Sequence, residues 1–221
     1  MKRFLFILLA AALCLTSCMS TKEILYRGQM FGTLNGVGVM IGDDGRNYRF
    51  QNNDQMTTNM PASGRIVAIF DVYGLVEGTS NDYEAELLDY VVPLCKEPVI
   101  CTTAEEDEAL GNAPVALTDG VWGGGHINML CDALVLPNSS SSHTINLQII
   151  PSENTDTLHT VLRHNPGEDV YNDLTRDSYA EYPFYASFPI ADYLPEGKST
   201  VLEVKYLWDE EWHSVYATIS K

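Results

Sequence analysis

The sequence predicts an all-β protein with two domains, a small closed barrel followed by an antiparallel β-sandwich. Apolar and polar residues alternate with period two along most of the 221-residue chain, and Gly, Pro, Asn and Asp separate the alternating runs. One acidic, breaker-rich stretch, residues 105–114, interrupts the pattern and is typical of a linker between domains. Hydrophobic residues make up 45% of the chain, which is enough to build a core in each domain.

The first domain, residues 24–104, is expected to contain five strands. They are predicted at residues 24–33, 36–41, 47–50, 65–75 and 83–92. Gly42-Asp43-Asp44-Gly45 predicts a hairpin turn with its acids in solvent. The polar segment 51–61 is expected to be a loop or one short helical turn. An early hairpin and a longer connection in the middle of five strands are typical of a barrel of the OB type.

The second domain, residues 115–221, is expected to contain about seven strands. Ile145, Leu147 and Ile149 alternate cleanly with polar residues, and the run that ends at Trp208 does the same. The seven are predicted near Val115 and at residues 125–136, 143–149, 157–164, 182–188, 201–208 and 212–219. Strands at such regular spacing favour an antiparallel sandwich.

The N-terminus predicts a bacterial lipoprotein. Lys2 and Arg3 precede a short apolar run, which is typical of a secretory signal. Leu15-Thr16-Ser17-Cys18 then reads as a lipobox, so residues 1–17 would be removed, Cys18 would be acylated, and residues 18–23 would form a tether. Attachment to the membrane would rest on the acyl chains, palmitate among them.

Charge and cysteine content limit the classes of partner. Loss of Lys2 and Arg3 would take the formal net charge from −17 to −19, and so acidic a surface repels nucleic acids. Cys95, Cys101 and Cys131 match no zinc spacing. Export to an oxidising compartment would permit a disulfide between Cys95 and Cys101, while buried free thiols are the alternative.

No motif for catalysis, a metal or a cofactor is recognisable in the sequence. Gly-x-Ser-x-Gly is absent, and no histidine pair has the spacing of a zinc motif. We therefore expect no catalytic residues, no metal and no cofactor. A hydrolase, the weakest alternative, would require a compact buried cluster of acids with histidines from the set His126, His159, His164 and His213.

Aromatic residues of the barrel are the candidate ligand-binding residues. OB barrels stack extended ligands on aromatic side chains, and the candidates here are Tyr26, Tyr48, Phe50 and Tyr73. Without neighbouring basic residues, a glycan or peptide is the expected ligand. The alternative is that these rings fill the barrel core.

The order of several motifs resembles the NigD-like lipoproteins of Bacteroidetes. The lipobox and the Asp/Gly hairpin are followed by Leu162-Arg163-His164-Asn165, and then by Ser187-Phe188-Pro189-Ile190 with Tyr193. The resemblance implies an OB-like N-terminal domain and an immunoglobulin-like C-terminal sandwich. It also implies attachment to the outer membrane of a Gram-negative bacterium. Residues 162–165 are interpreted as a structural corner, in which Arg163 pairs with an acid and Asn165 shapes the turn.

Two further expectations follow from that resemblance. Surface-exported lipoproteins of these bacteria carry several acids after the lipidated cysteine, whereas residues 19–23 contain one; the periplasmic face is therefore favoured over the cell surface. Asp156-Thr157-Leu158 matches their short O-glycosylation motif, which makes Thr157 a candidate for modification.

We expect a lipid-anchored, non-catalytic binding module of the cell envelope, with a protein, peptide or glycan as partner. The family takes its name from a gene in a bacteriocin cluster. The resemblance therefore implies an alternative function, in which the protein confers immunity by sequestering a toxic peptide.

Overall fold

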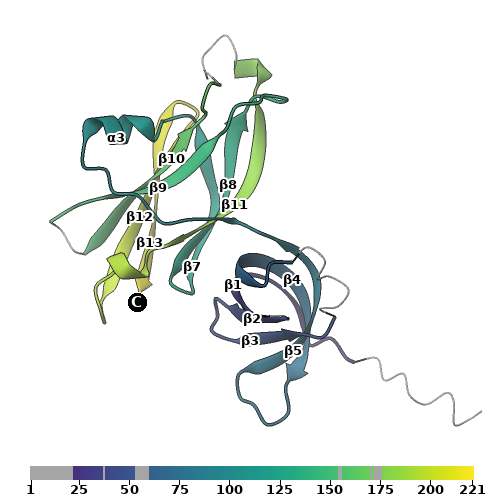
Figure 1. Cartoon of the computed structure of the whole chain (residues 1–221). Coiled ribbons are helices and arrows are strands. Elements are labelled where there is room, and N and C mark those ends of the chain that lie inside the picture. Colours follow the sequence, from purple (N-terminus) through teal and green to yellow (C-terminus); the bar gives the residue numbers. More distant parts are fainter. Residues whose placement is uncertain (1–21, 37, 53–59, 154–155, 170, 172–175) are drawn as a thin grey trace, which may run out of the picture.

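The computed structural model describes residues 22–36, 38–52, 60–153, 156–169, 171 and 176–221 (Figure 1). A β-barrel near the N-terminus contacts one end of a larger β-sandwich. The prediction of an all-β fold built from these two parts is confirmed. Among the residues in these ranges, no helix is long and apolar enough to cross a membrane.

Five strands close the barrel. In chain order they are β1 (Tyr26–Asn35), β2 (Val39–Gly42), β3 (Asn47–Phe50), β4 (Ser63–Leu75) and β5 (Asp82–Val91). They are hydrogen-bonded in the order β1-β2-β3-β5-β4, and β1 also pairs with β4 to complete the barrel. Strands β3 and β5 run parallel, and the closed five-strand arrangement agrees with the predicted OB type.

Strand β4 is apolar on both faces because each face is covered by a different part of the protein. Ile66, Ala68 and Phe70 point into the barrel core, where Phe70 packs on Tyr48 with ring centroids 4.6 Å apart. Val67 faces the opposite way and is also buried, at 3% exposure. The second covered face is the first sign that the barrel packs against the sandwich.

The sandwich consists of two four-stranded sheets. One sheet has the order β13-β12-β10-β9 and the other β6-β11-β8-β7. The strands are β6 (Leu94–Cys95), β7 (Val115–Gly123), β8 (His126–Val135), β9 (Thr144–Ile150), β10 (Thr157–Asn165), β11 (Ala180–Pro189), β12 (Ser199–Trp208) and β13 (Glu211–Ser220). Two pairs, β10 with β12 and β6 with β11, are parallel, so the sandwich is not purely antiparallel as predicted.

The boundary between the domains lies earlier than predicted. The barrel ends with β5 at Val91, and β6 already pairs with β11 of the sandwich. Val99 then bridges to Gln148 at the edge of β9. The expected boundary at residue 104 is therefore wrong, because residues 94–104 supply backbone hydrogen bonds to both sheets.

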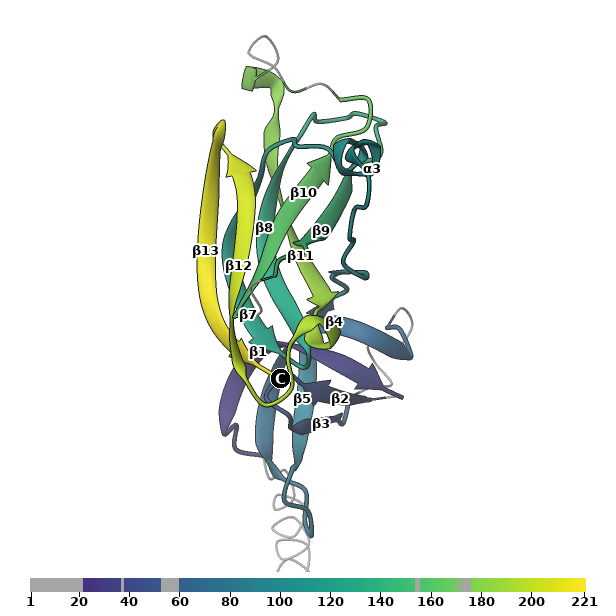
Figure 2. The same cartoon turned by 90° about the vertical axis from the view of Figure 1, so that its left-hand side faces the viewer.

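The acidic segment 105–114 is not a free linker, because half of it belongs to a short helix packed on the sandwich. Helix α3 (Ala104–Ala109) begins with a capping box formed by Thr103 and Glu106, which satisfies backbone N–H groups of the first turn. Gln148 of β9 donates to Asp107 at 2.6 Å. The helix lies at the end of the sandwich away from the barrel (Figures 1 and 2), and two 3₁₀ turns, η1 (Arg176–Ser178) and η2 (Ala191–Tyr193), complete the described elements.

No disulfide joins the cysteines of the described residues. Cys95, Cys101 and Cys131 are all free thiols. Between Cys95 and Cys101 the chain leaves the edge of one sheet, where β6 pairs with β11, and reaches the other sheet at Val99. Of the two alternatives left open by the sequence, the structure has free thiols, because the residues between Cys95 and Cys101 carry the chain from one layer of the sandwich to the other.

Candidate functional site in the cleft between the domains

The junction of the two domains is built on a buried ion pair within the barrel. Asp43 lies in the turn between β2 and β3, and Arg65 lies near the start of β4. The guanidinium donates twice to the carboxylate, with Nη1–Oδ1 and Nη2–Oδ2 distances of 2.7 Å each. Such paired, charge-assisted hydrogen bonds fix orientation as well as adding energy. Asp43 had been expected in solvent, but its side chain is only 13% exposed.

Two polar residues of the sandwich complete this junction. Arg65 Nη2 donates to Asn128 Oδ1 at 2.7 Å, and Arg65 Nε donates to Ser187 Oγ at 3.2 Å. Asn128 in turn donates to Asp43 Oδ2 at 2.7 Å. Asn128 and Ser187 are both fully buried, and Ser187 also donates to Asn128 at 2.7 Å. The polar groups here therefore form one network of bonds within and between the domains. We call Asp43, Arg65, Asn128 and Ser187 the junction cluster.

Glycines in the turn between β7 and β8 allow the carboxylate of Asp43 to enter the junction cluster. A Cβ placed on Gly123 would lie 2.6 Å from Asp43 Cβ, and one on Gly124 would lie 2.4 Å from Asp43 Oδ1. Gly124 also has a φ of +57°, which favours glycine. The bare backbone of these glycines receives the hairpin turn of the barrel.

A cleft of about 620 Å³ opens beside the junction cluster. Barrel strand β1 forms one wall and sandwich strand β7 forms the other. Apolar groups dominate the lining, and the residues are Gln29, Met30, Phe31, Asp43, Asp44, Val67, Asp119, Gly120, Val121, Trp122, Asn128, Leu130 and Tyr185. The volume and apolar character are typical of a binding site.

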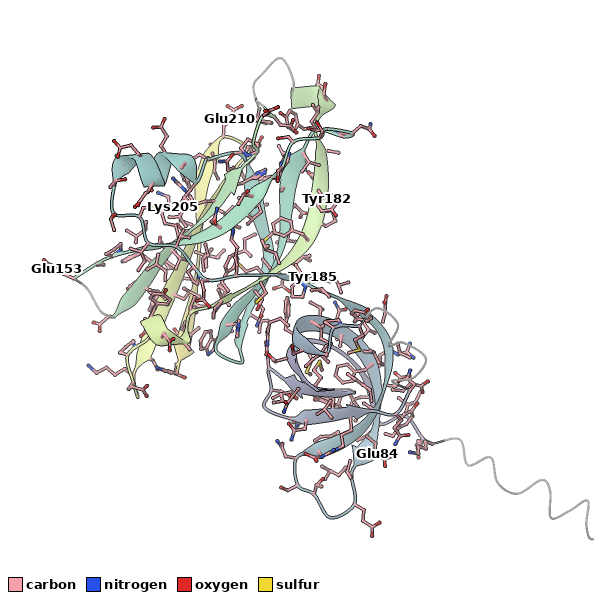
Figure 3. All side chains as sticks on the ribbon, in the orientation of Figure 1. Glu84, Glu153, Tyr182, Tyr185, Lys205 and Glu210 are labelled. Carbon is pink, nitrogen blue, oxygen red and sulfur yellow. The ribbon has the colours of Figure 1, made fainter. Side chains whose placement is uncertain are left out.

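Tyr185 of β11 joins the two walls of the cleft. Its hydroxyl accepts a hydrogen bond of 3.1 Å from Gln29 Nε2, and its ring meets Phe31 edge-on at a centroid distance of 5.7 Å. Figure 3 shows Tyr185 where the sandwich meets the barrel. Because both ends of the side chain are engaged, the width of the cleft is set by direct contact between the domains.

Asp119 is the uncompensated charge of the cleft. Its Oδ1 accepts the backbone N–H of Gly120 at 2.8 Å, and none of the ion pairs among the described residues includes it. Asp44, by contrast, accepts from the Tyr48 hydroxyl at 2.7 Å and lies 3.6 Å from Arg46. An exposed carboxylate beside apolar walls suits a ligand that combines apolar groups with a positive charge.

The predicted aromatic surface of the barrel is not assembled. Tyr48 and Phe50 are buried in the barrel core, at 0% and 5% exposure, so their assignment as ligand-binding residues is wrong: a five-stranded barrel needs large rings to fill it. Tyr26 is half-buried, with its hydroxyl 3.2 Å from that of Tyr48. Tyr73 lies in a separate depression with Lys22, and its hydrogen bond to Glu86 raises the pKa of Tyr73 to about 12.

The residues 162–165 hold helix α3 onto the sandwich. Leu162 is in the core. Arg163 donates to the Asp107 carbonyl at 2.7 Å and to Asn112 at 2.6 Å, and it lies 3.1 Å from the Asp107 carboxylate. Asn165 donates to the Ala109 carbonyl and accepts from the Gly167 N–H. None of these four residues lines the cleft.

A chain of hydrogen bonds that sequence reasoning missed passes through two histidines. His164 Nε2 lies 2.9 Å from His143 Nδ1, and His143 Nε2 lies 3.0 Å from Asp169 Oδ2. The other nitrogen of His164 faces the Pro114 carbonyl at 3.0 Å and must therefore donate. His143 Nδ1 then donates to His164 Nε2, and His143 Nε2 faces the carboxylate of Asp169. This series of hydrogen bonds ends at the Pro114 carbonyl on one side and at Ser139, which donates to Asp169, on the other.

The four histidines named for a hydrolase do not gather in one place. His126 contacts the Gly124 carbonyl, and His213 contacts the Trp208 carbonyl. His159 pairs with Glu203 on the outer face of its sheet, and His164 is buried in the chain described above. Nor does any group of three or more His, Cys, Asp or Glu residues suited to a metal occur within the described ranges.

The two predicted sites of modification are distant from the cleft or outside the described residues. Thr157 is half-buried at the first position of β10. Cys18 lies in the segment 1–21, outside the described residues.

Comparison with known proteins decides the family. The model of the NigD-like C-terminal beta sandwich domain matches residues 98–218, more than half of the chain. The chain belongs to the NigD-like family. The match begins at Pro98, between β6 and α3, which agrees with a sandwich that starts before the acidic segment.

Solved structures show that the NigD-like fold extends over both domains. A candidate toxin-related protein from Parabacteroides distasonis is 20% identical; the match covers 88% of this chain and 94% of that one, with a TM-score of 0.66. A NigD-like immunity protein from Bacteroides caccae is 16% identical, with 88% and 93% covered and a TM-score of 0.59. A candidate lipoprotein from Bacteroides fragilis is 14% identical, with 88% and 97% covered and a TM-score of 0.59. None of the curated proteins matches the chain.

Proposed function

We propose that this NigD-like protein is a lipid-anchored envelope protein that binds an extended polypeptide in the cleft between its domains, without catalysing a reaction. The main support for this proposal is the cleft. The junction cluster holds one wall from each domain around an apolar groove. The groove also contains Asp119, a carboxylate outside the ion pairs of the described residues. The lipobox at Cys18 supports the anchor, as does the name of the Bacteroides fragilis structure. We place the protein in the outer membrane, facing the periplasm.

The chemistry of the cleft favours a peptide over other ligands. Apolar side chains such as Met30, Val121 and Trp122 line both walls, and they suit the side chains of an extended chain. A formal charge of −17 for the whole sequence and the exposed Asp119 disfavour nucleic acid and favour a basic partner.

The second candidate is immunity, in which the bound polypeptide is a toxin that the protein sequesters. The name of the Bacteroides caccae structure supports this version of the function. It predicts that purified protein neutralises the toxin and that a deletion strain becomes sensitive to it, whereas a general envelope interaction predicts no such protection.

Site-specific crosslinking in cells tests the binding proposal. A photoreactive amino acid replaces Val121, which is 57% exposed in the cleft, and a control chain carries it at Leu75, which is 51% exposed but outside the cleft lining. We expect a polypeptide adduct from position 121 alone. No adduct from position 121, or equal adducts from both positions, would contradict the proposal.

A matched pair of charge reversals sharpens the crosslinking result. Asp119 and Asp89 are both exposed strand residues whose Oδ1 accepts the next backbone N–H at 2.8 Å, but only Asp119 lines the cleft. The adduct should be lost in Asp119→Lys and retained in Asp89→Lys. Equal yields from the two variants would exclude a role for the cleft charge.

Protease accessibility tests the location. The proposal expects both domains to be protected in intact cells and digested after lysis, with the Cys18→Ala variant released into the soluble fraction. Digestion in intact cells would place the domains on the cell surface, and retention of Cys18→Ala in the membrane would refute the lipid anchor.

A further inference from the structure

Two strand edges are left unpaired on the same side of the sandwich. Within the described part of the chain, β7 pairs with β8 alone and β13 pairs with β12 alone, so each is the outer strand of its sheet. Figure 2 shows β13 (yellow) along that edge of the sandwich. An unpaired edge presents free backbone N–H and C=O groups to a partner.

An apolar slot of about 260 Å³ lies between these two edges. Val215 and Ala217 of β13 pair with the buried Val204 and Leu202 and therefore face the interior of the sandwich. They are nevertheless exposed, Val215 at 40%. In a sandwich, the opposite sheet normally covers inward-facing residues of this kind. The slot is therefore a part of the hydrophobic core that the side chains of one further strand would fill.

Gly120 of β7 is the reason that the slot stays open. It pairs with Met129, whose side chain is in the core, so position 120 faces the interior. Its φ lies outside the left-handed range, and a Cβ there would come no closer than 3.7 Å to Asn128 O and 3.8 Å to Leu117 Cδ1. A Cβ atom would therefore fit without strain, so the backbone does not require glycine at this position.

The slot is continuous with the cleft. Asp119, Gly120, Val121 and Trp122 line both of them, so one strand, β7, forms a wall of each. Trp122 closes one end of the slot by donating from Nε1 to the Ser220 carbonyl of β13 at 3.1 Å. An extended chain that lies along β7 would therefore contact both the cleft and the slot.

We propose that the polypeptide bound by this protein adds to β7 as a further strand, with alternate apolar side chains in the slot and a basic side chain opposite Asp119. This inference rests on the proposed function and specifies how the ligand binds. Strand addition draws affinity from backbone hydrogen bonds and specificity from pockets for every second side chain. Asp119, the exposed carboxylate of β7 that the described ion pairs leave out, supplies the charge complementarity that selects a basic chain.

A displayed library of random twelve-residue peptides tests the proposal without advance knowledge of the ligand. The library is selected on the purified wild-type protein and on two variants that fill the slot from opposite sides, Gly120→Val and Ala217→Leu. Thr218→Val is the matched control, because residue 218 neighbours Ala217 on β13 but faces away from the slot. Circular dichroism and thermal unfolding establish that every variant is folded.

We expect wild type and Thr218→Val to enrich peptides that alternate apolar residues and contain Lys or Arg. Each filled variant should bind the best of these peptides at least about tenfold more weakly. N-methylation of alternate backbone amides, on the edge that pairs, should weaken binding by a similar factor, because it removes the hydrogen bonds of an added strand.

Three outcomes would overturn the inference. Enriched peptides that lack alternation, or that bind the filled variants as well as wild type, would leave the cleft as the site but exclude strand addition at β7. A complete failure to enrich would contradict peptide binding itself and with it the proposed function. A concentration-dependent dimer of the wild type, dissolved by Gly120→Val, would assign the slot to a second copy of the chain.

Discussion

Arg65 of the barrel and Asn128 of the sandwich are joined by a 2.7 Å hydrogen bond from Arg65 Nη2 to Asn128 Oδ1, with both side chains buried. The guanidinium also holds Asp43, which itself accepts from Asn128. Arg65 Nε and the side-chain N–H group of Asn128 donate across the junction, and a buried polar group without a partner is costly. The junction cluster therefore couples the stability of the domains to their relative position, which sets the width of the cleft.

Replacing Arg65 by methionine should destabilise the protein by about 3–5 kcal/mol, because it leaves the Asp43 carboxylate buried without its cation. Equilibrium unfolding in urea, followed by fluorescence, measures the loss. Lys22→Ala is the control: its ion pair with Glu84 is exposed on both sides, and its loss should cost less than about 1 kcal/mol. An equal, small effect of both changes would show that the junction cluster contributes little.

Alanine at Gly123 should destabilise more than alanine at Gly45, although Gly45 has the unusual backbone. Gly45 has a φ of +78° and nothing within 4 Å of an added Cβ, so its substitution costs about 1 kcal/mol of conformational strain. In Gly123→Ala the added Cβ would lie 2.6 Å from Asp43 Cβ. The resulting overpacking should cost about 1–3 kcal/mol of stability, and displacement of Asp43 would also weaken its ion pair with Arg65. Thermal unfolding ranks the two, and the reverse order would contradict close packing at the turn.

Acid should weaken the fold through His164 before most carboxylates titrate. Burial lowers the pKa of His164 to about 4, from an ordinary value of 6.5. Between these values the unfolded chain binds a proton that the folded chain excludes, so the free energy of unfolding falls as the pH falls from 6.5 to 4. The loss reaches about 3 kcal/mol, and the contribution is fully present above pH 6.5.

Urea unfolding at a series of pH values tests the His164 prediction. His164→Asn should flatten the dependence between pH 6.5 and 4, whatever its effect on stability at neutral pH. His213→Asn is the control, because His213 is a partly exposed residue that stacks on Tyr206. A wild-type stability that stays constant over this range would refute the burial of a neutral His164.

The thiols should differ sharply in reactivity with a water-soluble disulfide reagent. Desolvation raises the pKa of both thiols, which lowers the thiolate fraction that reacts. Access to the reagent distinguishes them, because Cys95 is exposed whereas Cys131 is buried. We expect rapid labelling of Cys95 and labelling of Cys131 only after unfolding. Mass spectrometry of the non-reduced protein should find no peptide that links Cys95 to Cys101, and finding one would contradict the described path of the chain.

Much of the fold was predictable from local pattern. Residues that are adjacent in the chain were enough to predict several elements. These are the hairpin at Gly42–Gly45, the strand at 65–75 with two apolar faces, and the alternating strands at 143–149 and 201–208. The aromatic residues were harder to assign, because a ring that fills a barrel and a ring that stacks a ligand occupy the same strand positions. Tyr48 and Phe50 proved to be core for that reason.

The sequence by itself determined the all-β class, most of the strands and the lipobox, because each depends on residues that are close together in the chain. The family resemblance depends instead on the order of short motifs along the chain. Only the tertiary structure decided that Asp43 meets Arg65 and Asn128, that helix α3 replaces a linker, and that β7 borders both the cleft and the slot. The contacts of Asp43 join residues that are 22 and 85 positions apart, and Trp122 of β7 bonds to Ser220 over 98 positions. They depend on how the two domains pack against each other, and the local alternation of apolar and polar residues carries no information about that packing.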